Sequence, residues 1–376
     1  MKEVLIVSAD DILLYQPTLL NLYDYLSDTF AVRIISFEPE FLGTQKEESR
    51  NIIYLSTTKW KKRILRYAEL IINAPLKRID KYLFKLPFRV QYVRNYKFHL
   101  LCKELKKHHP DQVISVDFMP LVAVQKILGN AHLLSLEILS YDPYVKRAEV
   151  PKIKSLLIQN ELRLNYLFPK EKPRVFYIQN SPSCANSHFN NGEREGLVWG
   201  GTIAKMFGVF HCIEFIKTNP QFSLVLKGGA PANVLDEIRS AYGDLIDSSK
   251  LVINTQYLSA FEYIKFLSGF RIGFCFYEWN IIRDNINYQT APSGKLFMYL
   301  AAGLPVVACK IPGFQFVEEY GAGVLINDYK PETIAAAIKV IEADYSSFQQ
   351  NCYKAFSDFC FEKNAVALKS FLTAGG

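Results

Sequence analysis

The chain has 376 residues, of which 49% are hydrophobic and 14% aromatic, and its formal net charge is +7. Because single hydrophobic cores stop growing at about 250 to 300 residues, we expect two domains. Neither the proline and glycine content nor any internal repeat indicates a disordered chain or a solenoid, so an ordered globular protein is expected.

The first half of the chain predicts a parallel α/β domain. Residues 4–7 form a nearly unbroken apolar run, which is typical of a strand buried on both faces. A helical pattern over residues 19–26 and a second strand at 31–37 complete a β-α-β opening. A helix ending near Pro110 is then followed by a strand at 112–116, a helix at 119–128 and a strand at 132–138. We interpret residues 1–180 as one Rossmann-like domain.

The second half repeats this alternation after a polar, turn-rich segment, residues 181–196, which we interpret as a linker. The expected strands are 197–199, 223–226, 251–254, 272–276, 306–309 and 324–326. The expected helices are 209–218, 232–242, 260–267, 295–302 and 331–343. Residues 197–345 therefore predict a second doubly wound domain, and the aromatic-rich residues 346–376 predict a C-terminal helix. Loops after the strands of such a sheet share one rim, where ligands bind.

Three glycine-containing loops are expected on that rim: Gly200-Gly201-Thr202, Gly228-Gly229 and Ser293-Gly294. Glycine allows the backbone to approach a ligand closely, and a helix N-terminus attracts anions. Lys205 and Lys295 would add full positive charges. The pattern favours a phosphate-bearing ligand such as a nucleoside diphosphate. The alternative is that these glycines are ordinary turns of an α/β domain.

The established phosphate and metal motifs are absent from the sequence. Gln289 and Leu296 occupy the places where a Walker loop around Gly294-Lys295 would need Gly and Ser or Thr. No Gly-x-Gly-x-x-Gly follows the first strand, and no Asp-x-Asp is present to hold a metal on a diphosphate. We expect no metal and no separate cofactor.

The seven cysteines form an odd set without Cys-x-x-Cys spacing, and several lie in apolar runs. This usage predicts reduced core thiols in a cytoplasmic protein rather than a disulfide framework. The N-terminal apolar run is too short for a secretory signal, and no stretch approaches the ~20 apolar residues of a transmembrane helix. We expect a soluble cytoplasmic protein.

Residues 291–308, Ala-Pro-Ser-Gly-Lys-Leu-Phe-Met-Tyr-Leu-Ala-Ala-Gly-Leu-Pro-Val-Val-Ala, resemble a motif of the GT-B glycosyltransferases, in particular of the retaining enzymes grouped as glycosyltransferase family 4. Val198-Trp-Gly-Gly-Thr-Ile-Ala-Lys is similar to the donor-phosphate loop of that family, and segments such as His109-Pro-Asp-Gln-Val-Ile-Ser-Val-Asp match its first domain. The resemblance implies two Rossmann-like domains facing across a cleft, the first binding the acceptor and the second binding the nucleotide sugar. It also implies that the C-terminal helix, residues 346–376, returns to the N-terminal domain.

The resemblance also implies roles for individual residues. It places Lys205 and the Gly200-Gly201 loop on the donor diphosphate, and Ser293, Gly294 and Lys295 near the diphosphate and ribose. Tyr277 and Glu278 are candidate base or ribose contacts. Asp117 and Glu137 would face the cleft from the first domain, and Asp10 and Asp11 lie in a loop where acceptors enter. Met298 stands where the family has a ribose-binding Glu, and Glu278 is the first candidate to replace it.

The expected reaction is transfer of a sugar from a nucleotide-diphosphate sugar to a hydroxyl of a glycan or lipid-linked acceptor, without a metal and with retention. Two alternatives remain open. One is a nucleotide-sugar epimerase of the same fold, which needs no acceptor. The other is a catalytically degenerate GT-B scaffold protein, suggested by Met298.

Residues 59–97 make the protein basic, with twelve Lys and Arg against two acidic residues, a net +10. A helix here would place Trp60, Ile64, Tyr67, Ala68 and Ile71 on one face and Lys61, Lys62 and Arg66 away from it. Such a helix can lie on an anionic membrane, which would suit a lipid-linked acceptor. The alternative is that the apolar face packs on the first domain. No nucleic-acid-binding module accompanies the segment, so nucleic acid is not expected as a partner.

Overall fold

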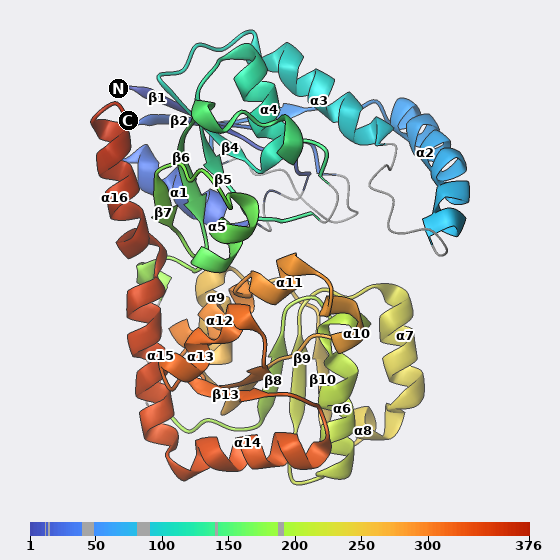
Figure 1. The fold of residues 1–376 in the computed structure, drawn as a ribbon. Coiled ribbons are helices and arrows are strands. Elements are labelled where there is room, and N and C mark those ends of the chain that lie inside the picture. Colours follow the sequence, from blue (N-terminus) through green and yellow to red (C-terminus); the bar gives the residue numbers. More distant parts are fainter. Residues whose placement is uncertain (12, 14–15, 40–48, 81–90, 140–141, 187–191) are drawn as a thin grey trace. The chain divides into compact units, whose positions relative to one another are not determined.

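The computed structural model describes residues 1–11, 13, 16–39, 49–80, 91–139, 142–186 and 192–376. The chain forms two compact units, one made of residues 1–178 with 365–376 and the other of residues 179–364. We call them unit 1 and unit 2. Each unit is built on one parallel sheet with helices around it, so the predicted pair of Rossmann-like domains is confirmed (Figure 1). The segment 181–196, expected as a linker, falls within unit 2.

Unit 1 contains a seven-stranded sheet with the strand order β3-β2-β1-β4-β5-β6-β7, and every pair is parallel. Its strands are β1 (Glu3–Val7), β2 (Ala31–Phe37), β3 (Ile52–Leu55), β4 (Gln112–Val116), β5 (Ala131–Leu134), β6 (Ile153–Ile158) and β7 (Val175–Tyr177). Its helices are α1 (Pro17–Ser27), α2 (Lys59–Asp80), α3 (Tyr92–Leu105), α4 (Phe118–Ile127), α5 (Glu161–Leu167) and most of α16 (Phe361–Thr373).

The centre of this sheet follows directly from the apolar strands. Val4 to Val7 are all fully buried in β1, which lies between β2 and β4. The odd-numbered side chains Leu5 and Val7 pack in a core cluster with α3 and α4. Parallel sheets are covered on both faces, so unbroken apolar runs mark their central strands. The carboxyl ends of β1 and β4 are thereby neighbours, which brings the loops that follow them together.

Unit 2 contains a six-stranded parallel sheet with the order β10-β9-β8-β11-β12-β13. Its strands are β8 (Leu197–Gly200), β9 (Leu224–Lys227), β10 (Leu251–Asn254), β11 (Ile272–Cys275), β12 (Val306–Cys309) and β13 (Gly323–Ile326). Its helices are α6 (Val209–Thr218), α7 (Ala232–Ala241), α8 (Gly243–Asp247), α9 (Ala260–Leu267), α10 (Trp279–Ile282), α11 (Ile286–Thr290), α12 (Gly294–Ala301), α13 (Phe316–Glu319), α14 (Pro331–Ala343) and α15 (Tyr345–Phe359).

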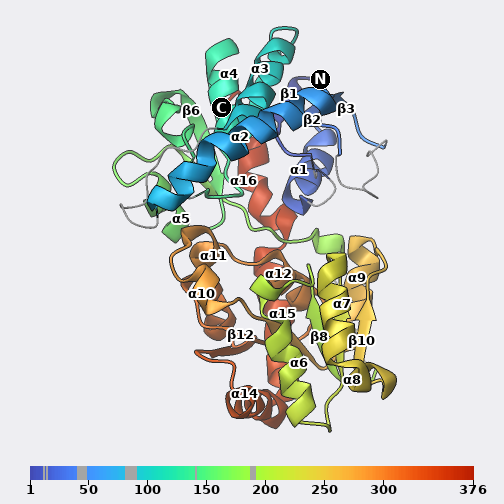
Figure 2. The same cartoon turned by 90° about the vertical axis from the view of Figure 1, so that its right-hand side faces the viewer.

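The two faces of this sheet are buried in separate cores. Leu197 and Trp199 of β8 pack under α6, α7 and α14, whereas Val198 points to the opposite face, under α9, α12 and α15 (Figures 1 and 2). This alternation is the two-residue period of a strand. Both faces of β8 are therefore fixed by packing, and its end at Gly200 is held in place.

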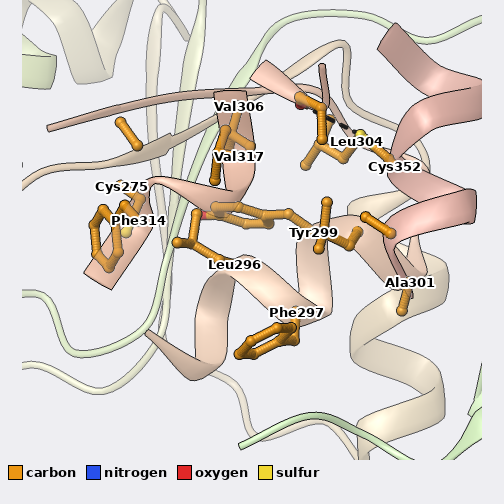
Figure 3. Close-up of a cluster of buried hydrophobic side chains, with 14 of the residues drawn as sticks. Cys275, Leu296, Phe297, Tyr299, Ala301, Leu304, Val306, Phe314, Val317 and Cys352 are labelled. Carbon is orange, nitrogen blue, oxygen red and sulfur yellow. Dashed lines mark hydrogen bonds between the residues drawn. The ribbon is translucent and has the colours of Figure 1, made fainter. Parts of the chain in front are cut away.

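Helix α12 is anchored by its apolar face. Leu296, Phe297, Tyr299 and Leu300 are buried in one core cluster, and Figure 3 shows Leu296 and Tyr299 on one side of the helix and Phe297 on the other. The Tyr299 hydroxyl accepts a hydrogen bond from the backbone N–H of Gly200 at 2.7 Å and donates one to the carbonyl of Phe274 at 3.1 Å. A buried hydroxyl with both bonds made ties α12 to β8 and β11.

The C-terminal segment, expected as one helix, is broken at Cys360 into α15 and α16. Residues 365–376 belong to unit 1, where the ammonium group of Lys369 donates to the carbonyl oxygen of Tyr25 and the ring of Phe371 lies against Phe176. Residues 179–364, including α15, belong to unit 2. The last helix therefore carries the chain from unit 2 back to unit 1.

The prediction of reduced cysteines is wrong for one pair. Cys184 and Cys360 form a disulfide across 176 residues, and the other five cysteines are free thiols. The break between α15 and α16 places Cys360 beside the short 3-10 turn Cys184–Asn186, where Phe361 N–H also donates to the carbonyl of Pro182. Among the described residues, no helix is both long and apolar enough to cross a membrane.

Candidate functional site

Two of the three expected glycine loops meet at the rim of the unit 2 sheet. Gly201 has φ 116° and Gly228 has φ 147°, both in the region that favours glycine. A Cβ on Gly228 would overlap the carbonyl oxygen of Gly201. The Gly201 N–H donates a hydrogen bond to the carbonyl oxygen of Lys227, and the Ile203 N–H donates one to the carbonyl oxygen of Gly229. The loops after β8 and β9 are thus bonded together, and Gly228 is required by this packing whether or not a ligand binds.

Lys295, in the first turn of α12, reaches this pair of loops. Its Cε would lie 3.4 Å from a Cβ on Gly201. Its Nζ lies 3.9 Å from the centroid of the Trp199 ring, 5.3 Å from Phe207 and 5.8 Å from Tyr277. Burial lowers the pKa of this ammonium group, and Nζ has no hydrogen-bond partner among the residues that the structure describes. Cation–π contacts with three rings stabilise the charge in place of hydrogen bonds.

Lys205 and Thr202 lie in a more open environment. Lys205 begins a short 3-10 turn, its side chain is 70% exposed, and its Nζ lies 3.4 Å from a carboxylate oxygen of Glu237. Thr202 is exposed. An exposed ion pair of this kind contributes little to stability, so Lys205 can change partners at low cost. The two lysines expected on the diphosphate therefore differ: one is held by aromatic rings, and the other is on the surface.

Tyr277 and Glu278 follow β11 but have different surroundings. Tyr277 is only 6% exposed, and burial raises the pKa of its hydroxyl. Its ring lies 5.8 Å from Lys295 Nζ and is too buried to offer a surface on which a base could stack. Glu278 is partly exposed, and its carboxylate lies 2.9 Å from Nε2 of His211 on α6. His211, which the sequence reasoning missed, therefore fixes the carboxylate expected to contact ribose.

The N-terminus of α12 is closely packed on the segment that enters unit 2. A Cβ on Gly294 would come within 2.8 Å of the Asn180 side-chain nitrogen, so a larger residue there would require the Asn180 side chain to move. Ser293 occupies the N-cap position, but its side chain makes no capping hydrogen bond. Met298, where the resemblance expects a carboxylate, packs against the apolar core beneath α12. A carboxylate there would be partly buried against apolar groups.

Unit 1 contains a cavity of about 540 Å³ at the carboxyl ends of β1 and β4. The acidic residues expected to face an acceptor all line it: Asp10, Asp11, Asp117 and Glu137. Helices α2 and α3 contribute Lys62, Arg66, Arg94 and Lys97 to the same wall. The cavity therefore contains both charge signs: the four expected carboxylates lie on loops after strands, and the cations lie on the two helices, where Glu69 of α2 adds a further carboxylate.

Asp117 is the most strained of these residues. It has φ 61° and ψ 179°, a conformation that only glycine adopts readily. Its Oδ1 accepts hydrogen bonds from the N–H groups of Leu136 at 2.8 Å and Glu137 at 3.1 Å. Burial raises the pKa of Asp117, the nearby carboxylate of Asp10 adds to the effect, and the resulting pKa is about 8. Burial also raises the pKa of Asp10. A carboxyl group that keeps its proton near neutral pH is a candidate proton donor.

The cations of the cavity were recognised in the sequence only as part of a basic segment. Asp11 lies 3.4 Å from Lys97 Nζ and 3.9 Å from Lys62 Nζ, and Asp142 lies 2.7 Å from Arg94. Lys97 Nζ also donates to the carbonyl of Ala9. The spacing of Lys62, Arg66 and Glu69 along one helical face was the signal that could have predicted their common position.

Comparison with solved structures gives the fold. No protein-family model matches the sequence, and no curated protein matches it. The α,α-trehalose-phosphate synthase (UDP-forming) from Burkholderia vietnamiensis superposes with a TM-score of 0.67 at 11% identity, covering 100% of each chain. HepE from Anabaena, in complex with UDP and glucose, has a TM-score of 0.66 at 11% identity over 100% of each chain. WaaG, a glycosyltransferase involved in lipopolysaccharide biosynthesis, has a TM-score of 0.63 at 11% identity over 97% of this chain and 98% of its own.

The chain has the GT-B fold. The fold predicted from the sequence is therefore confirmed, while the assignment to glycosyltransferase family 4 stays a prediction. Within this GT-B chain, the loops of Gly201 and Gly228 and the side chain of Lys295 meet at the rim of unit 2. Asp117 and Glu137 meet in the cavity of unit 1.

Proposed function

We propose that this GT-B protein is a glycosyltransferase that moves a sugar from a nucleotide-diphosphate sugar to a hydroxyl group. The observation that carries the proposal is Lys295, whose buried ammonium group has no hydrogen-bond partner among the described residues and lies beside Gly201. A cation in such surroundings is poised for an anion, because charge-assisted bonds gain strength where water is excluded. The bound UDP and glucose of HepE support a nucleotide-sugar ligand for this fold.

In the proposed reaction the bond between the anomeric carbon and the phosphate oxygen breaks, and its electron pair leaves on the nucleoside diphosphate. A new bond forms between the anomeric carbon and the acceptor oxygen, whose proton passes to the departing phosphate. Lys295, Lys205 and the N–H groups at Ser293 and Gly294 would stabilise the negative charge that grows on the diphosphate. These groups act without a metal, and we expect retention of configuration, as in the trehalose-phosphate synthase studied for glycosyl transfer with retention.

Glu278 is proposed to bind the ribose hydroxyls in place of the missing carboxylate at Met298. It lies directly after β11 at the rim, and His211 holds its carboxylate at 2.9 Å. A carboxylate accepts hydrogen bonds from two adjacent hydroxyls, which is the geometry that a ribose presents. Tyr277 is proposed to support Lys295 rather than to contact the base, because its ring is buried.

The proposal is tested by a thermal-shift panel of UDP-, GDP-, ADP- and CMP-linked sugars. A ligand that binds only the folded protein raises the melting temperature, and at a fixed concentration a tighter ligand raises it more. We expect one nucleotide class to raise it, and no shift with any member of the panel would contradict the proposal.

The alternative of an epimerase is separated by its products. An epimerase converts the nucleotide sugar without an acceptor, whereas a transferase releases nucleoside diphosphate at a rate that rises with acceptor concentration. Incubation with the donor alone, followed by chromatography of the sugar nucleotides, distinguishes the two. A new nucleotide sugar in that sample would favour the epimerase.

A further inference from the structure

Helix α2 presents opposite chemistry on its two faces. Trp60, Ile64, Tyr67 and Ile71 follow the spacing of one helical stripe, and each is 57% exposed or more. The apolar face of α2 is exposed and does not pack on unit 1. The alternative interpretation of the sequence, in which this face packs on the first domain, is therefore wrong. Ala68, expected on the same face, is partly buried. Figure 2 shows α2 along its length, and it packs against α3 of the same unit.

The opposite face of α2 forms a wall of the unit 1 cavity. Lys62, Arg66 and Glu69 line that cavity, and Lys62 is only 8% exposed although it is a lysine. Lys62 is therefore not a solvated surface charge, since its ammonium group points inward to within 3.9 Å of Asp11. The carboxylate of Asp11 stabilises this buried ammonium group, and the pair places a fixed positive charge on the wall of the cavity.

A second cavity of about 320 Å³ adjoins the first along α2. Lys62 and Arg66 line both, and Lys59 and Arg63 complete the cationic wall of the second, opposite a single carboxylate from Glu38. Arg63 and Arg66 form no ion pair with any carboxylate in the part of the chain that the structure describes. The two cavities together offer guanidinium groups in reach of an external anion, and guanidinium binds phosphate in a bidentate manner.

We propose that the acceptor is a phosphorylated lipid, whose phosphate binds Arg63, Arg66 and Lys62 while its hydrocarbon chain stays in a membrane on which the apolar stripe of α2 rests. This inference depends on the proposed glycosyl transfer, because the cavity is taken as the acceptor site. A lipid surface fits better than a protein partner because Trp60 and Tyr67 share the stripe with aliphatic residues while Lys59, Lys61 and Arg63 flank it. Aromatic rings with flanking Lys and Arg are the pattern of a helix at an anionic membrane interface.

The two faces then act together. The stripe fixes the protein on the membrane, and the cationic wall of the same helix receives the phosphate that projects from that membrane. Asp10, Asp117 and Glu137 lie in the same cavity, where they can orient hydroxyl groups attached beyond the phosphate. Because one helix carries both functions, membrane binding and selection of the lipid phosphate are separable by substitutions on opposite faces.

The test measures binding to vesicles of three compositions by sedimentation: phosphatidylcholine alone, phosphatidylcholine with phosphatidylglycerol, and phosphatidylcholine with a polyprenyl monophosphate. We expect the wild-type protein to bind the polyprenyl phosphate vesicles best. The double variant W60S/I64S should bind all charged vesicles at least about tenfold more weakly, because exposed apolar side chains no longer enter the interface. Both residues are exposed, so the variant should fold like the wild type, which circular dichroism checks.

Arg66→Gln and Lys61→Gln form a matched pair, because each removes one charge from α2 but only Arg66 lines the cavities. Both should weaken binding to phosphatidylglycerol vesicles by roughly the same factor, about fivefold. Only Arg66→Gln should remove the preference for polyprenyl phosphate over phosphatidylglycerol. Equal loss of that preference in both variants would overturn the lipid-phosphate site, and unchanged vesicle binding by W60S/I64S would overturn the membrane face.

A different partner for the apolar stripe, or a different ligand in the cavities, would give a different experimental result. A concentration-dependent dimer that W60S/I64S abolishes in sedimentation velocity, without vesicle binding by the wild type, would assign the stripe to a second copy of the chain. Wild-type binding to inorganic phosphate as tight as to polyprenyl phosphate vesicles would show a free-anion site and contradict the lipid acceptor. Nucleotide-sugar binding by unit 2 is measured separately, so loss of that binding with vesicle selectivity intact would count against the transferase and not against the lipid site.

Discussion

The Nζ of Lys295 lies 3.9 Å from the centroid of the Trp199 ring, and the two residues come from different elements, α12 and β8. Tyr299 of the same helix bonds the N–H of Gly200, the residue after Trp199. Two adjacent contacts therefore fix α12 on β8, so the cation is held in place before any ligand arrives. Such preorganisation is what electrostatic stabilisation of a leaving group requires.

The buried ammonium group predicts proton uptake on nucleotide binding. Burial lowers the pKa of Lys295, and a bound diphosphate would raise it again, so a fraction of the protein takes up a proton when it binds at alkaline pH. Calorimetric titrations in buffers of different ionisation enthalpy measure this uptake. It should be absent in Lys295→Met, and equal uptake by wild type and variant would assign the proton to another group.

Lys295→Met should also lower turnover by about 100-fold or more, because it removes one positive charge from the surroundings of the leaving group. Steady-state rates with a donor identified by thermal shift, compared with those of Lys339→Met on the exposed side of α14, measure this loss. A full rate in Lys295→Met would remove the residue from the mechanism.

Gly228→Ala should lower the free energy of unfolding by about 1–3 kcal/mol or more, because φ 147° is strained for alanine and the new methyl group would overlap the Gly201 carbonyl. Gly229→Ala is the control, because nothing lies within 4 Å of a Cβ there. Urea denaturation of both variants measures the difference. Equal stabilities would show that the two loops do not have the contact described.

Asp117→Asn should change how stability depends on pH. The pKa of Asp117 is about 8 in the folded protein, against 3.8 as its ordinary value, so the folded state holds a proton that the unfolded state releases in this range. The contribution of Asp117 to the free energy of unfolding is therefore greatest below pH ~4. This contribution falls as the pH rises toward 8. Asparagine keeps the acceptor for Leu136 and Glu137 N–H but does not titrate.

Denaturation at pH 5 and pH 8 provides the comparison. The wild type should lose more stability than Asp117→Asn between these two values. The same loss in both proteins would mean that Asp117 is ionised throughout and that its surroundings do not retain the proton.

The disulfide predicts a count of thiols and a change in stability. Denatured, unreduced protein should react with a thiol reagent at five cysteines, and reduced protein at seven. Replacing Cys184 and Cys360 with serine should lower the unfolding free energy by about 2–4 kcal/mol under oxidising conditions. The difference should nearly vanish in excess reductant. Seven reactive thiols without reduction would rule out the bond.

Much of the fold could be predicted from local sequence. Helices 209–218 and 331–343 have the expected bounds, because their apolar residues repeat clearly and end at turn signals. The edge strand β3 was missed although Ile52–Leu55 is an apolar run, because a run of four residues is too short for its period to separate a strand from a helix. The disulfide could not be predicted, because it depends on the helix ending at Cys360, between α15 and α16, and on a partner 176 residues away in the sequence.

The candidate site was predicted in part. Strand order places the loops of Gly201 and Gly228 on one rim, which the α/β pattern already implies. The rings around Lys295 come from β8, a 3-10 turn and the end of β11, and their convergence depends on tertiary packing alone. The helical period of α2 identified its apolar face, but only the structure shows that this face is outward and that Lys62 points inward.

The most direct test of the central claim is calorimetric titration of the nucleotide sugar selected by thermal shift into wild type, Lys295→Met and Lys339→Met. Loss of a charge-assisted hydrogen bond weakens affinity by at least about tenfold. We predict this loss for Lys295→Met and wild-type affinity for Lys339→Met. Binding of equal strength in all three proteins would contradict the assignment of the nucleotide-sugar site to the rim of unit 2.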